Sequence, residues 1–324
     1  MDENRALHAK KVASLSEIDG IVKGCTNWNS LEEIKLFLED ILSTVGIDLD
    51  SIRLNDSGPV RIIDLCSGSG VYGIALAALI DRPCEISFID IVGEYHETAI
   101  NATERVLGET TTATTHTCSA DNTDLPDDYF DLAVEADGFH HCPSVELALN
   151  EAWRVIKSNG IFIGIDRIHP NRITDSKINE LLNVRYPKEW LEKYGYKVES
   201  LTRRENGENE IRFTEWAEPL KLKGSYFTYI EYVKTGSDSL KMWALSTAPW
   251  ILALLKRKFG GWVVPPRWGF GLLPTVVFGV SYSLRKRFYK AVYRSFPMNA
   301  QSSMKRCQVI VAEKGKAHAN MTQG

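Results

Sequence analysis

The chain has 324 residues, of which 44% are hydrophobic and 25% are charged, and its formal net charge is −4. This balance is ordinary for a soluble globular protein, and the length is ample to bury a core. The opening MDENRALHAKK lacks an apolar core, and the six cysteines form neither C-x-x-C pairs nor metal-binding spacings. We therefore expect no secretory signal, no metal site and a reducing, cytoplasmic location.

Residues 1–58 are expected to form an N-terminal helical cap. Asn29 and Ser30 offer a cap for a helix over 31–45, whose apolar residues fall on one face. Glu32 and Glu33 lie in its first turn, where the helix dipole favours acids. We expect this helix to cover a sheet, with residues 46–58 as a linker.

A buried strand followed by a glycine-rich turn is predicted from residue 60. Residues 60–65 form a nearly continuous apolar run, which is typical of a parallel strand covered on both faces. Gly68, Gly70 and Gly73 satisfy G-x-G-x-x-G, and residues 71–80 have the small and apolar composition of a helix on a sheet. This order of strand, turn and helix predicts a cradle for a nucleotide-like cofactor.

Two cofactor classes compete for this cradle. A dinucleotide would place its pyrophosphate at the helix N-terminus, where the Asp64 carboxylate would repel it. S-adenosylmethionine instead carries a sulfonium and an ammonium group, which an acid attracts by about 4 kcal/mol at about 4 Å separation. The residues therefore favour the cationic cofactor.

The stretch DLCSGSG, from Asp64 to Gly70, resembles the D-L-G-x-G-x-G motif of class I S-adenosylmethionine-dependent methyltransferases. Cys66 replaces the usual first glycine, which a thiol allows if the local φ is negative. The resemblance implies a Rossmann-like α/β fold with a seven-stranded sheet and helices on both faces. It also implies that S-adenosylmethionine is bound by Asp64, Cys66, Ser67, Gly68 and Gly70.

A second predicted strand, over 84–91, ends at Asp90 and Ile91. In the resembled family an acid at this place accepts hydrogen bonds from both ribose hydroxyls, so Asp90 and Ile91 are predicted to contact the cofactor. An NAD-dependent oxidoreductase would use the same acid. Asp90 therefore supports a ribosyl cofactor without choosing between the two classes.

Further family segments follow in order. After a third strand over 114–118, Asp121 and Asn122 stand where the family meets the adenine amino group, although Asp121 can also be read as a turn residue. A fourth strand over 129–134 is followed by Glu135, which the resemblance places at the cofactor. The match continues through a helix over 145–155 and a fifth strand over 161–166.

Phe139-His140-His141-Cys142 lies on the loop that faces the reaction. The family commonly carries two histidines here that help to start the next helix, so one interpretation of the pair is structural. The other is His140 as a general base or substrate contact, and we take His140 as the candidate catalytic residue. A metal site is the weakest interpretation, because adjacent histidines point in different directions on most backbones.

The predicted domains follow from these segments. Residues 59–235 form the S-adenosylmethionine-binding core, in which 167–208 is a lid or substrate-facing segment and 226–233 is a sixth strand. Residues 306–324 hold the final antiparallel strand, over 307–313, and a tail. Residues 236–305 are then an insertion between two hairpin strands.

The insertion 236–305 is basic and apolar, and we expect it to be helical. No Asp or Glu occurs between Ser239 and Ala312, whereas twelve Lys or Arg residues do, among two apolar runs too short to span a membrane. Two interpretations stay open: peripheral contact with an anionic membrane through its four tryptophans and cationic clusters, or a substrate cap or dimer face. Nucleic acid is not expected as a partner, since the apolar content exceeds what a phosphate-binding surface needs.

The predicted function is S-adenosylmethionine-dependent methyl transfer to a small apolar or amphipathic molecule of the quinone, lipid or secondary-metabolite type. An alternative is a catalytically inactive cofactor-binding module that meets a membrane or partner through 236–305. An NAD-dependent oxidoreductase is a weaker third reading. The acceptor atom and the oligomeric state are not indicated by the sequence.

Overall fold

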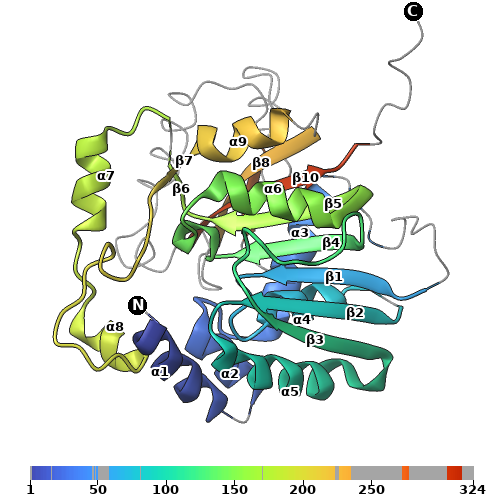
Figure 1. Cartoon of the computed structure of the whole chain (residues 1–324), viewed down its shortest axis with the longest axis horizontal. Helices are drawn as coiled ribbons and strands as arrows, with labels where there is room; N and C mark the ends of the chain where they lie inside the picture. Colours follow the sequence, from blue (N-terminus) through green and yellow to red (C-terminus); the bar gives the residue numbers. More distant parts are fainter. Residues whose placement is uncertain are drawn as a thin grey trace, which may run out of the picture.

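The computed structural model describes residues 2–15, 17–45, 47, 49, 58–80, 82–169, 171–222, 226–234, 272–276 and 305–315. Within these residues the centre of the molecule is a twisted eight-stranded sheet flanked by helices (Figure 1). The strand order is β3-β2-β1-β4-β5-β10-β8-β9. The strands are β1 (Val60–Leu65), β2 (Cys84–Asp90), β3 (Thr111–Thr117), β4 (Phe130–Ala136), β5 (Ile156–Asp166), β8 (Tyr226–Lys234), β9 (Leu272–Val276) and β10 (Lys305–Glu313).

The predicted Rossmann-like sheet is confirmed, with one strand more than expected. Strands β3, β2, β1, β4 and β5 run parallel, and β10 inserts antiparallel between β5 and β8. These seven strands are the ones that the sequence predicts, and β9 adds an eighth at the edge beyond β8. The register aligns Leu65 with Ile89 and with Glu135, so the carboxyl ends of β1, β2 and β4 meet at one edge.

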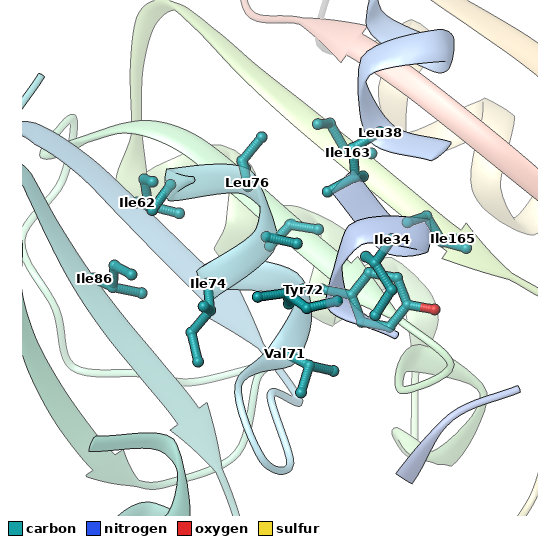
Figure 2. Packing of buried hydrophobic residues seen from close by; sticks show 14 of the residues in the cluster. Ile34, Leu38, Ile62, Val71, Tyr72, Ile74, Leu76, Ile86, Ile163 and Ile165 are labelled. Atoms are coloured by element: carbon teal, nitrogen blue, oxygen red, sulfur yellow. The ribbon is translucent and has the colours of Figure 1, made fainter. Parts of the chain in front are cut away.

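Helices cover both faces of the sheet because the buried strands are apolar on both sides. One face packs against α3 (Leu31–Val45), α4 (Val71–Ala77) and α5 (His96–Leu107), and the other against α6 (Val145–Val155) and α9 (Phe213–Leu222). Figure 2 shows Ile34 and Leu38 of α3 lying over Ile163 and Ile165 of β5. Fully burying an aliphatic side chain of this size contributes about 1.5–3 kcal/mol. Short 3-10 turns η1 (Gly93–Tyr95), η2 (Gly108–Thr110) and η3 (Phe139–His141) lie between these helices and strands along the chain.

The N-terminal region contains more helix than the sequence indicates. Besides the predicted α3, the structure has α1 (Asp2–Ala13) and α2 (Ile18–Cys25). Tertiary contacts hold α1 in place: the His8 ring lies 2.5 Å from the Tyr95 hydroxyl and 3.1 Å from the Gly24 carbonyl oxygen. Lys11 Nζ donates to the backbone carbonyls of Glu192 and Lys193.

The predicted lid segment, residues 167–208, leaves the sheet edge and returns to it. It contains β6 (Ile168–His169), α7 (Asp175–Leu182) and α8 (Lys188–Lys193), and it is followed by β7 (Ile211–Arg212). Because β6 and β7 pair in parallel, both ends of the excursion are fastened together. Figure 1 shows α7 and α8 beside the sheet, with α8 next to α1.

The predicted helical character of the insertion 236–305 is wrong at residues 272–276. These residues form strand β9, which pairs antiparallel with β8. Pro274 disfavours a helix interior, and an edge strand tolerates it because its missing N–H can face away from the sheet. The rest of the insertion, apart from Lys305, lies outside the described residues, as do the membrane and substrate-cap interpretations of it. None of the helices described in the structure is long and apolar enough to cross a membrane.

Candidate active site

A cavity of about 560 Å³ opens at the carboxyl edge of the sheet. It is surrounded by the carboxyl ends of β1, β2, β3 and β4 with the turns that follow them, by α1 and the loop after α2, and by the lid segment. Six of the predicted site residues line this cavity, namely Cys66, Ser67, Gly68, Asp90, Ile91 and His140. The other predicted site residues, Asp64, Gly70, Asp121, Asn122 and Glu135, are outside its lining.

The glycine turn, residues 66–70, joins β1 to α4 through three residues with positive φ. Gly68 and Gly70 have φ of 50° and 76°, and Cys66 has φ of 55°. The expectation of a negative φ at Cys66 is therefore wrong: the thiol residue keeps the left-handed backbone that a glycine adopts at little cost. Cys66 and Cys142 both line the cavity, and their Sγ atoms lie 3.9 Å apart.

Gly70 and Asp64 stabilise the glycine turn on the side away from the cavity. A Cβ at Gly70 would lie 2.6 Å from the ring of Phe88, so this glycine allows α4 to pack closely on β2. The Asp64 carboxylate accepts a hydrogen bond from the Gly73 amide at 2.8 Å. Burial raises the pKa of Asp64 well above its usual range, the Gly73 hydrogen bond opposes this, and the nearby Asp90 charge adds to it. Asp64 thus supports the turn rather than facing the cavity.

The packing of Cys66 against Gly138 gives a testable prediction. A Cβ at Gly138 would lie 2.3 Å from the Cys66 Cβ, while the φ of Gly138, −122°, suits any residue. We expect Gly138→Ala to lower the free energy of unfolding by about 1–3 kcal/mol through overpacking. Adding Cys66→Gly should recover most of that loss, because it removes both the clash and the positive-φ side chain. Denaturant unfolding of the two single variants and the double variant measures this coupling, and additive losses would contradict it.

Asp90, at the end of β2, lines the cavity and fastens the glycine turn. Its Oδ2 accepts from the Gly68 amide and its Oδ1 from the Val92 amide, both at 2.8 Å. Beside it, the Ile91 side chain is 45% exposed, which is unusual for a large apolar residue next to a buried strand. An acid and an apolar surface therefore stand together at this side of the cavity.

The segment after β3 faces the cavity with its first residues. Cys118, Ser119 and Ala120 line it, whereas Asp121 and Asn122 do not. A tight turn explains the difference, because the Asn122 amide donates to the Ser119 carbonyl at 3.1 Å. The interpretation of Asp121 as a turn residue is the one that this geometry favours.

Glu135 is fully buried at the end of β4 and holds the histidine turn, residues 137–142. Its Oε1 accepts from the amides of Gly138, at 2.8 Å, and Phe139, at 3.1 Å. Burial raises the pKa of Glu135 well above its usual range, and the Asp166 charge adds to this while the two amides oppose it. Glu135 thus supports the turn from beneath, and its predicted contact with a cofactor stays a prediction.

His140 is buried and lies at the cavity with its ring held by Asp166. Asp166 Oδ1 lies 2.7 Å from His140 Nδ1, and Asp166 Oδ2 accepts from the His140 amide at 2.9 Å. Burial raises the pKa of Asp166 to about 7, against the hydrogen bond from the Arg167 amide. When Asp166 is ionised it accepts the proton on Nδ1, which makes Nε2 the basic nitrogen of His140.

Acids and one guanidinium set the charge around His140. Asp137, with φ of 54°, lines the cavity, and desolvation raises its pKa to about 6, with the charge of Asp166 adding to this and Arg167 opposing it. Arg167 also lines the cavity, and its Nη2 donates to Glu208 Oε2 at 2.6 Å. Sequence reasoning singled out none of these three residues, because no local pattern marks them.

Ligand atoms of His140, His141 and Glu208 lie within 4.8 Å of one another, a spacing that could hold a metal ion. However, Glu208 Oε2 already accepts from two guanidinium groups, those of Arg167 and Arg203 at 2.6 and 2.8 Å. Their positive charges oppose a cation at this carboxylate. The chemistry of the site therefore favours hydrogen-bonding roles for these side chains.

Aromatic residues of the lid form one wall of the cavity. We call Tyr186, Trp190, Tyr194 and Tyr196 the aromatic cluster, and all four line the cavity. The sequence predicts 167–208 only as a lid or substrate-facing segment, without these four residues. The signal that could have found them is the spacing Y-x₃-W-x₃-Y-x-Y, four aromatic residues within eleven positions of a polar segment.

Residues 63–164 match the family model described as a methyltransferase domain. The YcgJ protein from Bacillus subtilis is similar in structure, with 17% identity, a TM-score of 0.47, and coverage of 88% of this chain and 100% of that one. A protein from Galdieria sulphuraria proposed to be a sarcosine dimethylglycine methyltransferase has 13% identity, a TM-score of 0.47, and coverage of 89% and 87%. No curated protein matches the sequence.

The matched segment runs from β1 to β5 and includes the glycine turn, Asp90 and the histidine turn. The chain therefore contains a methyltransferase domain over residues 63–164. This match disfavours the alternative that the glycine turn belongs to an NAD-dependent oxidoreductase.

Proposed function

We propose that this chain is an S-adenosylmethionine-dependent methyltransferase that acts on a small acceptor with an apolar or amphipathic body, of the quinone, lipid or secondary-metabolite type. The observation that supports this is a single cavity that joins the glycine turn and Asp90 to His140 and the aromatic cluster. A volume of about 560 Å³ falls in the range of small-molecule sites, about 300–1,000 Å³. Cofactor and acceptor would then meet at the histidine turn.

The residues at the β2 end of the cavity fit S-adenosylmethionine. Asp90 has two carboxylate oxygens for ribose hydroxyls, and Ile91 offers an exposed apolar surface for a purine ring. Asp90 and Asp137 supply acidic groups toward a cationic ligand, the role that the sequence analysis gives to Asp64. When bound, the cofactor supplies an activated methyl group on a sulfonium.

The chain's own residues have two tasks in such a reaction. The cavity walls hold the acceptor in line with the methyl group, and proximity of this kind can contribute about 7–11 kcal/mol. His140 then removes a proton from the acceptor, which contributes about 10²–10⁴-fold in rate, while Asp166 keeps the imidazole in the required orientation. Because the sulfur leaves as a neutral thioether, no acid is required at the leaving group.

The test is transfer of radiolabel from S-adenosylmethionine labelled in the methyl group to fractions of a cell extract. We expect label in a small-molecule fraction that partitions into organic solvent, together with calorimetric binding of S-adenosylhomocysteine and none of NADH. Heat-treated protein is the control. Binding of S-adenosylhomocysteine without labelling of any fraction would instead support the inactive cofactor-binding module, and labelled protein or nucleic acid would contradict the small-molecule acceptor.

A further inference from the structure

The aromatic cluster is a connected set of rings rather than scattered side chains. Trp190 is at its centre: its ring stacks on Tyr186 with centroids 4.0 Å apart and planes at 14°, and lies 4.5 Å from Tyr194 and 5.4 Å from Tyr196. Trp190 is carried by α8, and Tyr186 comes just before this helix. Rings that support one another in this way present a stiff surface, which suits a planar ligand.

A polar group stands at one end of this wall. Glu208 and Asn206 are buried and line the cavity, and Asn206 Nδ2 lies 3.4 Å from both Glu208 Oε1 and the Tyr186 hydroxyl. Arg167 and Arg203 both donate to Oε2 of Glu208, so they fix this carboxylate in place. An ionised carboxylate only accepts hydrogen bonds, so a ligand that meets Glu208 has to bring a donor.

The same carboxylate is close to the candidate base. One polar atom each of His140, His141 and Glu208 lie within 4.8 Å of one another. A ligand lying on the aromatic cluster can therefore reach both a base and a fixed acceptor with groups on neighbouring atoms. The two hydrogen-bonding positions come from different segments of the chain, His140 from the turn after β4 and Glu208 from the end of the lid.

We propose that the acceptor is a planar aromatic ring with two neighbouring hydroxyl groups, one facing His140 and the other facing Glu208. This rests on the proposed function and narrows it to O-methylation. The hydroxyl at His140 gives its proton to Nε2, and its oxygen forms a bond to the methyl carbon. The carbon–sulfur bond breaks and its electron pair goes to sulfur, so the products are a methyl ether, S-adenosylhomocysteine and one proton.

The cation nearest to the rings disfavours an ammonium group lying on the aromatic cluster. Aromatic walls attract cations, but Lys193 Nζ already lies 4.5 Å from the centre of the Tyr194 ring. The Arg167 charge in the cavity lining is paired with Glu208. A neutral ring that donates hydrogen bonds therefore suits the face of the cluster better than an ammonium group.

The test measures binding of four probes to the full-length protein saturated with S-adenosylhomocysteine: catechol, phenol, cyclohexanediol and benzylamine. Calorimetry should give catechol the highest affinity, phenol about tenfold less, and the other two less again. Trp190→Leu should weaken catechol about fivefold or more, whereas Trp153→Phe, which changes a buried tryptophan outside the cavity, should not. Glu208→Gln should bring catechol close to phenol.

Two outcomes would overturn the inference. One is equal or tighter binding of cyclohexanediol or benzylamine than of catechol to the unaltered protein, a comparison that does not depend on any variant folding. The other is an unchanged catechol affinity in folded Trp190→Leu. Loss of S-adenosylhomocysteine binding, or label transfer to no small molecule, would instead count against the proposed function itself, so the two failures are distinguishable.

Discussion

Replacing His140 by glutamine is expected to lower kcat by about 10²–10⁴-fold while leaving the affinity for S-adenosylhomocysteine within about twofold. The reason is that glutamine can keep a hydrogen bond to Asp166 but cannot accept a proton from the acceptor. Single-turnover kinetics with a labelled methyl group and calorimetry measure the two quantities. His141→Gln is the matched comparison: its ring lies 4.1 Å from that of His140, yet Asp166 holds only His140 by the bonds described, so a loss below tenfold is expected. Equal small losses in both variants would return the pair to a structural role.

The pH dependence of kcat adds a second test of His140, through its hydrogen bond with Asp166. With the pKa of Asp166 raised to about 7, this carboxyl ionises near neutrality, and only then does it accept the Nδ1 proton of His140. We expect kcat to rise with pH across 7, and Asp166→Asn to flatten that rise. The free energy of unfolding changes with pH in the opposite sense. The folded state keeps the proton on Asp166 to higher pH than the unfolded state, so the contribution of Asp166 to the free energy of unfolding is full below about pH 4 and is lost as pH rises through 7.

Asp90→Ala is expected to weaken S-adenosylmethionine binding at least a hundredfold. The variant removes the acceptor of the Gly68 and Val92 amides and the two oxygens proposed for ribose, and each charge-assisted hydrogen bond is worth about 1.5–3 kcal/mol. Since 1.4 kcal/mol is tenfold in affinity, two such bonds exceed a hundredfold. Calorimetry with S-adenosylhomocysteine on the folded protein measures the effect.

Asp131→Ala is the matched control for Asp90→Ala. Asp131 likewise accepts two hydrogen bonds, from the Arg61 amide and from Lys157 Nζ, both at 2.9 Å, but it is buried outside the cavity lining. Its removal should lower stability and leave cofactor affinity unchanged. If both variants lose affinity to the same extent, the effect of Asp90 is one of general destabilisation.

The core of the fold was predictable because its signals are local. Apolar runs, the glycine turn and the Asn29-Ser30 cap mark β1, α4 and α3 within a few residues of their observed bounds. By contrast, α1 has little apolar periodicity, and it is held by contacts of His8 and Lys11 with distant residues. Strand β9 was missed for a related reason, since its short apolar sequence becomes a strand through pairing with β8.

The candidate site divides in the same way. Cys66, Asp90 and His140 lie at the ends of strands or in the turns that follow them, so their place at one edge of the sheet follows from chain order. Asp166 and Glu208 become neighbours of His140 only after β5 and the lid have folded back, at separations of 26 and 68 positions in the chain. The sequence also cannot separate a carboxylate that faces a cavity from one that supports a turn, which is why Asp64 and Glu135 were placed at the cofactor.

The origin of the cavity wall has a consequence for how such a protein can diverge. The aromatic cluster, Glu208 and the loop after α2 all lie outside residues 63–164, which match the methyltransferase domain. Substitutions in these flanking segments can therefore alter the acceptor while the strands and turns of the matched domain stay unchanged. Related chains that share this domain need not share an acceptor, and exchange of residues 167–208 between them is a direct route to new selectivity.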